Sequence, residues 1–116
     1  FSEERLKMLI DRARRVPTAQ LLAICTDAAL WPDMQYVDGQ SIRFDRVFCD
    51  VPCSNDGTIR KALNVLSQWT PRLGISCHGL QLAILRKGLE SLKEGGTLAY
   101  STCSINPIEC EAVVAA

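Results

Sequence analysis

One stretch, residues 44–58, constrains the fold of this chain more than any other, and it reads FDRVFCDVPCSNDGT. Residues 44–49 are apolar and rich in β-forming side chains, a pattern typical of a buried strand. The residues that follow favour turns and caps. Asp50 therefore stands at the carboxyl end of the strand, with Cys53 three positions beyond it. Ligands of open α/β sheets bind outside the carboxyl ends of the strands, so we expect both residues at a binding edge.

A second stretch, residues 95–104, has the same form. It reads GGTLAYSTCS, in which residues 97–101 are a predicted strand and the polar turn after it carries Cys103. Two strands would then deliver two thiols and one carboxylate to a single edge of a sheet. This convergence makes the edge the candidate site of the chain.

The other segments favour an α/β fold. Apolar residues at helical spacing predict three helices, over residues 3–15, 59–69 and 76–93. Asn106 and Pro107 are expected to begin a last helix. Residues 20–25 form a third apolar run, typical of a buried parallel strand. Loops are expected at residues 30–41 and 70–74, and the Glu-Gly-Gly of residues 94–96 is expected to end the long helix. The alternation indicates a mostly parallel, three-stranded sheet flanked by helices.

The composition of the chain excludes few classes of function. Thirteen basic and thirteen acidic residues cancel, so the net charge argues neither for nor against a nucleic-acid partner. No apolar run approaches the ~20 residues of a membrane span, and no segment has the form of a signal peptide. The six cysteines therefore indicate thiols of a reducing compartment rather than a disulfide framework. Their spacing, with His78 the only histidine, does not fit structural zinc. Cys25 and Cys49 lie in the apolar runs and are expected to be buried.

Several polar residues leave two interpretations open. Asp27 follows the 20–25 run and is either a turn or cap residue or part of the binding edge. Arg60 and Lys61 would lie in the first turn of a helix, where the dipole disfavours cations. They are either a solvated pair or face an anion. His78, in the first turn of the long predicted helix, is expected to pack or cap.

Two motifs carry a resemblance to a known family. Residues 50–61, DVPCSNDGTIRK, resemble the Pro-Cys motif of the Sun-domain RNA cytosine-5 methyltransferases. Residues 100–109, YSTCSINPIE, resemble their Thr-Cys motif. The details are most similar to the eukaryotic branch that methylates tRNA. The resemblance implies a partial Rossmann-like fold and a reaction that uses S-adenosylmethionine.

The resemblance also implies roles for individual residues. Cys103 would add to carbon 6 of cytosine. The addition turns the ring into an enamine-like species, whose carbon 5 can attack a methyl group. Cys53 would assist breakdown of the covalent adduct. Asp50 would contact the target base and the methionine end of the cofactor, and Asp27 would hold its adenosine part. The position of Arg60 and Lys61, directly after the Cys53 loop and at a predicted helix end, separately predicts that they contact RNA phosphate.

The resemblance sets expectations for the whole protein too. Residues 1–116 would be the C-terminal portion of a methyltransferase catalytic domain, with the first strands and the glycine-rich cofactor loop before Phe1. The isolated piece would then be inactive and would not bind S-adenosylmethionine measurably. The expected partner is RNA, tRNA above all, with no membrane and no metal. The expected location is the nucleus or nucleolus rather than the cytoplasm.

Two positions depart from the family pattern, and two other functions remain open. Asn55 stands where the family usually has glycine, and Cys110 where asparagine is common. One alternative is a catalytically inactive α/β module that binds RNA or protein. Another is a nucleotide-binding dehydrogenase domain, which would need a glycine-rich fingerprint after its first strand, and residues 1–116 contain none.

Overall fold

The computed structural model describes residues 2–16 and 21–116. It divides into two compact units, Phe1–Trp31 and Pro32–Ala116. Each unit is described by itself. Among the described residues, no helix is both long enough and apolar enough to cross a bilayer.

The first unit contains the predicted N-terminal helix. Helix α1 (Glu3–Ala13) ends two residues before the predicted boundary. The Ser2 hydroxyl accepts a hydrogen bond from the backbone N–H of Arg5, as an N-cap residue does. Farther along, the 3-10 helix η1 (Ala28–Leu30) is capped by Asp27, whose carboxylate accepts from the N–H of Ala29 at 2.9 Å.

The predicted strand at residues 20–25 is wrong for the part that the structure describes. Residues 21–25 have no regular secondary structure, and Gln20 lies outside the described residues. A strand needs hydrogen-bonding neighbours, and these residues pair with none of the described strands. The large apolar side chains of Leu21, Leu22 and Ile24 are consequently exposed, with Leu22 at 72%. Cys25 is half-buried rather than enclosed in a sheet.

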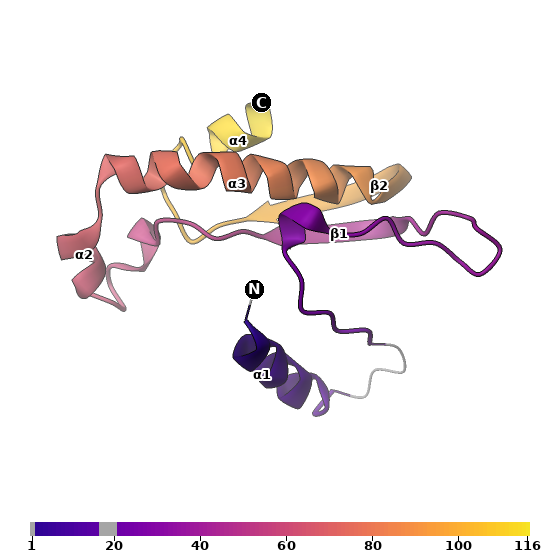
Figure 1. The fold of residues 1–116 in the computed structure, drawn as a ribbon. Coiled ribbons are helices and arrows are strands. Elements are labelled where there is room, and N and C mark those ends of the chain that lie inside the picture. The colour runs from indigo at the N-terminus through magenta and orange to yellow at the C-terminus, as the bar shows by residue number, and fades with distance from the viewer. Residues whose placement is uncertain (1, 17–20) are drawn as a thin grey trace. The chain divides into compact units, whose positions relative to one another are not determined.

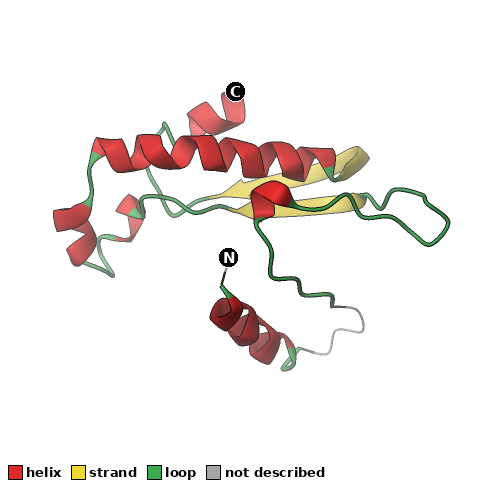
Figure 2. Cartoon of the chain, in the orientation of Figure 1, coloured by secondary structure: helices red, strands yellow, loops and turns green. Residues whose placement is uncertain are grey.

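The second unit is built on a parallel pair of strands, β1 (Phe44–Asp50) and β2 (Leu92–Ser101) (Figures 1 and 2). Their register pairs Cys49 with Tyr100 and Asp50 with Ser101, so both strands end at the same level. The predicted parallel α/β arrangement is confirmed. The predicted third strand is not found, since the sheet of the described residues has two strands.

Strand β2 begins five residues earlier than predicted, because the Glu-Gly-Gly segment belongs to the strand. Gly95 has a φ of +74°, a left-handed conformation that glycine adopts without a side-chain penalty. The register shifts at the same place, from Phe44 opposite Leu92 to Arg46 opposite Thr97. The glycines therefore form an irregularity of the strand instead of ending the helix.

Helix α3 (Pro71–Glu90) covers one face of the strand pair (Figure 1). It begins where a loop was predicted, because Thr70 is its N-cap and Pro71 its first residue. Gly88 lets the helix approach the sheet closely: a Cβ there would lie 2.7 Å from the Cys49 sulfur. Cys49 is buried in this contact, as expected.

The predicted helix over residues 59–69 is mostly wrong. After the 3-10 helix η2 (Asp56–Thr58), its place is taken by a turn at residues 59–61 and the short helix α2 (Asn64–Gln68). Arg60 and Lys61 lie in the exposed turn and not in the first turn of a helix. The predicted unfavourable effect of a helix dipole on them is therefore wrong. The last helix, α4 (Glu111–Ala115), also starts later than predicted, after a turn at residues 107–110.

Candidate active site

Two loops leave the same edge of the sheet, one after each strand. The backbone N–H of Val51 donates to the Ser101 carbonyl at 3.0 Å, so the chains still run side by side as they leave the strands. Beyond this point the sulfur atoms of Cys53 and Cys103 lie 3.0 Å apart, close enough to share a hydrogen bond. The structure thus brings together two thiols that are 50 positions apart in the chain.

Asn55 contacts both thiols, a role that the sequence did not predict. The Cys103 thiol donates to the Asn55 side-chain oxygen at 2.9 Å, and the Cys53 thiol lies 3.8 Å from the same atom. Asn55 has a φ of 61°, in the left-handed region where glycine is the usual residue. Asparagine is one of the few other types that visits this region routinely. The departure from glycine therefore keeps the backbone shape and adds an amide beside the thiols.

Backbone contacts fix the two loops to each other. The N–H of Gly57 donates to the Cys103 carbonyl at 3.0 Å, and the N–H of Ile105 donates to the buried Asp56 carboxylate at 3.0 Å. A Cβ on Gly57 would lie only 2.6 Å from the Cys103 carbonyl oxygen. Glycine at this position is what permits the close approach.

The Cys103 thiol is exposed, yet its surroundings favour the protonated form. Burial of part of the group, then the hydrogen bond and charge of Cys53, raise the pKa of Cys103 from 9.0 to about 11. The carboxylate of Asp50 adds to the same effect. Asp50 is the last residue of β1 and is exposed. In the free protein Cys103 is therefore a thiol at neutral pH, and it needs to lose its proton to become a nucleophile.

A buried carboxylate lies behind the loops. Glu109 is fully buried, and its two oxygens accept hydrogen bonds from the Ser54 N–H (2.9 Å), the Ser54 hydroxyl (2.5 Å), the Ser104 hydroxyl (2.9 Å) and the Gln81 amide (3.0 Å). Burial raises the pKa of Glu109, but these hydrogen bonds outweigh it and hold that pKa below its usual value. The sequence did not predict this role, because Glu109 lies in a segment predicted to be helical, where a glutamate is an ordinary residue.

The remaining predicted residues lie elsewhere. Arg60 and Lys61 are in the exposed turn after η2, and Asp27 caps η1 in the first unit. His78 packs as expected, with its Nδ1 2.7 Å from the Ile108 carbonyl oxygen. Within residues 2–16 and 21–116 no group of three or more metal-binding side chains is assembled.

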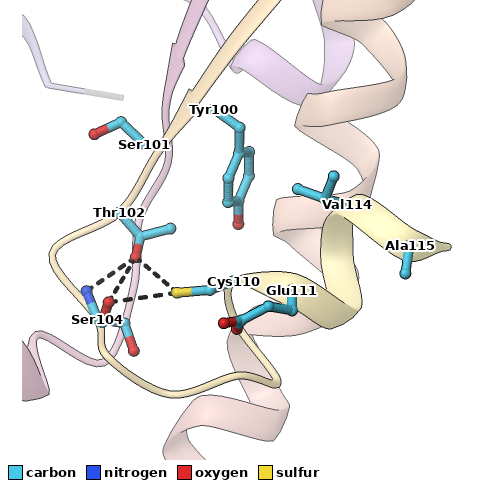
Figure 3. A pocket seen from close by; sticks show the side chains of 8 residues that line it. All are labelled: Tyr100, Ser101, Thr102, Ser104, Cys110, Glu111, Val114 and Ala115. Atoms are coloured by element: carbon cyan, nitrogen blue, oxygen red, sulfur yellow. Dashed lines mark hydrogen bonds between the residues drawn. The ribbon is translucent and has the colours of Figure 1, made fainter.

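A hollow of about 640 Å³ opens beside β2 and α4, and it does not include the thiol pair. Figure 3 shows Tyr100 and Val114 on its walls and a small polar cluster at one side. In this cluster the Cys110 thiol donates to the Ser104 carbonyl at 3.4 Å and lies 3.5 Å from the Thr102 hydroxyl. Cys110, the second departure from the family pattern, therefore supports the loop that carries Cys103.

Sequence comparison decides the family. The model of a family described as 16S rRNA methyltransferase RsmB/F matches residues 1–116, the whole chain. The chain belongs to the RsmB/F methyltransferase family. The Sun-domain resemblance of the two motifs is thereby confirmed.

Relatives of this RsmB/F chain include eukaryotic enzymes. The multisite-specific tRNA:(cytosine-C(5))-methyltransferase of Saccharomyces cerevisiae is 46% identical over 96% of the chain, and trm4b of Schizosaccharomyces pombe, named for the same activity, is 44% identical over 97%. The chain spans only 17% and 18% of the length of these proteins. The crystal structure of PH0851 is 28% identical and matches 98% of the chain, and 25% of its own, with a TM-score of 0.86. The fold is therefore the predicted partial Rossmann-like methyltransferase fold.

Proposed function

We propose that the full-length protein transfers a methyl group to carbon 5 of cytosine in RNA, through a covalent bond between Cys103 and the base. The observation that carries this proposal is the 3.0 Å contact between the Cys53 and Cys103 sulfurs at the carboxyl edge of the sheet. An exposed thiol in contact with a second thiol fits a reaction in which one sulfur attacks and the other assists. A structural role alone would not require either group to be exposed.

The chemistry of cytosine explains why a thiol is needed. Carbon 5 is a poor nucleophile until a sulfur adds to carbon 6 of the same ring. The addition breaks the 5,6 double bond and makes carbon 5 electron-rich. After methylation the carbon 5 proton has to leave and the carbon–sulfur bond has to break. The base must be unstacked from its neighbours before a protein side chain can reach it.

Cys103 is the better placed of the two thiols for the attack. It is exposed, whereas Cys53 is half-buried. Because surrounding groups raise the pKa of Cys103 to about 11, the sulfur becomes competent when its proton leaves during the attack. Cys53, in contact with it, then stands beside the carbon–sulfur bond that has to break. The same geometry would also permit exchanged roles, which the variants below distinguish.

Asp50 is assigned two contacts, with the base and with the cofactor. A carboxyl group at a strand tip can hold a proton against the ring nitrogen N3 and so favour addition at carbon 6. S-adenosylmethionine, when bound, supplies an electrophilic methyl group on a positively charged sulfur. Asp50 is exposed at the carboxyl edge of the sheet, where the ligands of open α/β sheets bind, so the methionine end of the cofactor is proposed to lie near it. Asp27, half-buried in the first unit, is proposed to hold the adenosine part.

The substrate is proposed to be tRNA, in line with the names of the two yeast relatives. Arg60 and Lys61 are proposed to contact its phosphates, since both are exposed in the turn that follows the Cys53 loop. A nuclear or nucleolar location is proposed together with this substrate.

Transfer of a labelled methyl group from S-adenosylmethionine to unmodified tRNA tests the proposal in the full-length protein. We expect label at cytosine carbon 5, and no label with Cys103→Ala. RNA that binds without acquiring label would support the alternative of an inactive binding module. Label at another base, or full activity of Cys103→Ala, would contradict the proposed reaction.

A further inference from the structure

Glu109 connects the two residues that directly follow the two cysteines. Ser54 comes after Cys53 and donates both its N–H and its hydroxyl to the Glu109 carboxylate. Ser104 comes after Cys103 and donates its hydroxyl to the same group at 2.9 Å. One carboxylate therefore bridges the two loops. It does so at the residues next to the cysteines, so a displacement of either loop there would move its thiol.

A third element holds the carboxylate in place. Gln81 of α3 is fully buried and donates to Glu109 at 3.0 Å and to the Pro52 carbonyl at 2.9 Å. Its own side-chain oxygen has no hydrogen-bond partner among the described residues. The unpaired oxygen is a cost of directing the amide N–H groups toward the loop and the carboxylate. Gly74 gives the space for this arrangement, since a Cβ there would lie 3.1 Å from the Glu109 carboxylate.

We propose that Glu109 is a positioning residue, which sets the distance between the Cys53 and Cys103 thiols and so prepares both for the reaction. The inference rests on the proposed function of the two cysteines. Glu109 is fully buried while Cys103 is exposed, so the carboxylate acts through Ser54 and Ser104 and not on the substrate.

The chemistry of the cluster requires a carboxylate and not an amide. Four donor groups point at two oxygens, each of which has more than one lone pair. In Glu109→Gln one of these oxygens becomes an NH2 group, which would face hydroxyl or N–H donors. The side-chain volume is nearly unchanged, so the variant removes the bridge without emptying the site.

Three variants of the full-length protein separate positioning from general stability. Glu109→Gln breaks the bridge on one side or the other. Ser104→Ala removes one donor to Glu109, together with the acceptor of the Asn106 N–H at 3.1 Å, and serves as the milder variant if Glu109→Gln does not fold. The control is Ser91→Ala, which also loses a buried hydroxyl, one that donates to the Lys87 carbonyl at 2.8 Å at the far end of α3.

Phenylarsine oxide measures the spacing of the thiols directly. It condenses with two neighbouring thiols: two S–H bonds break, two As–S bonds form, and the arsenic oxygen leaves with both protons as water. No oxidation state changes. The second bond forms inside the protein, so its rate reports the effective concentration of one thiol at the other. Peptide masses locate the captured cysteines, and Cys53→Ser and Cys103→Ser provide the background. Alkylation by iodoacetamide measures each thiol alone.

We expect capture of Cys53 with Cys103 to fall about tenfold or more in Glu109→Gln, with a smaller loss in Ser104→Ala and none in Ser91→Ala. Alkylation of the single thiols should change far less. The kcat for methyl transfer should fall by up to about a hundredfold, as a displacement of about 1 Å can cause, while the KM for RNA stays the same. Unchanged capture in a folded Glu109→Gln protein, or an equal loss in Ser91→Ala, would overturn the inference. If the wild-type protein captured the arsenical normally and yet transferred no methyl group, that result would instead contradict the proposed function. The distance between the thiols would then have no role in catalysis.

Discussion

The side-chain oxygen of Asn55 lies 2.9 Å from the Cys103 sulfur, although 48 positions of the chain separate the two residues. An acceptor in this place stabilises the S–H form of the thiol and opposes its ionisation. The amide is available because Asn55 occupies a left-handed position, with a φ of 61°, that glycine would fill without strain. Replacement by glycine therefore removes the amide and leaves the backbone unstrained.

Partial burial, Cys53 and Asp50 raise the pKa of Cys103 to about 11, and Asn55→Gly should lower this pKa. The reason is the loss of the acceptor of its proton, while Cys53 and Asp50 continue to act on it. The rate of alkylation of Cys103, followed by peptide mass against pH, gives the pKa. A rise in the pKa would show that the amide acts as a donor to the thiolate, in the opposite orientation.

Gly57→Ala should separate the loops. Its new Cβ would meet the Cys103 carbonyl oxygen at 2.6 Å, so one loop has to move, with a loss of about 1–3 kcal/mol in the free energy of unfolding. Cross-linking of Cys53 to Cys103 by dibromobimane should slow accordingly. The control is Gly79→Ala in α3, where a Cβ meets no atom within 4 Å and alanine favours the helix by about 1 kcal/mol. Equal cross-linking in both variants would show that the Gly57 contact does not fix the spacing.

Acid should weaken the contribution of Glu109. Hydrogen bonds hold the pKa of Glu109 below its ordinary 4.5 in the folded protein, so its stabilisation is complete above that value and is lost as the pH falls through the folded pKa. Burial, and to a lesser degree the charge of Glu109, raise the pKa of Cys77 and of Tyr100, but both of these groups are neutral in acid and do not titrate there. Once protonated, glutamic acid resembles glutamine. The difference in unfolding free energy between wild type and Glu109→Gln, from urea titrations, should therefore shrink below pH 4.5. A difference that stays constant into strong acid would exclude the carboxylate charge as its source.

Arg60 and Lys61 provide a test of the RNA surface. Replacing both by Gln should weaken tRNA binding and reduce the slope of log K against log salt by about 1–2, since fewer counterions are released. The control, Lys87→Gln with Lys93→Gln, removes the same charge from residues paired with Asp33 and Asp45, near the opposite end of the strands. An equal change of slope in both pairs would mean that the effect is one of net charge alone.

The sequence predicted the convergence of the two cysteine loops better than it predicted the elements around them. The two strands ending in cysteine loops were foreseeable, because β-forming runs and turn residues are local signals. Local signals predict a loop at Thr70 and Pro71, although these types also suit an N-cap and a first helical residue. Only the packing of α3 on the sheet decides between the two structures. Residues 21–25 have strand-like composition, but a strand requires partners that the described sheet does not supply. Asn55 and Glu109 gain their roles from contacts across about 50 positions, which no local pattern records.

In the proposed mechanism Cys103 attacks the base and Cys53 assists its release. Denaturing electrophoresis of full-length variants incubated with labelled tRNA and S-adenosylmethionine distinguishes the roles of the two thiols, because only a covalent protein–RNA adduct survives denaturation. With Cys53→Ala the attack remains possible and release is slow, so the adduct should accumulate. With Cys103→Ala no adduct should form and methylation should stop. An adduct that accumulates with Cys103→Ala and is lost with Cys53→Ala would contradict the assignment and exchange the roles of the two thiols.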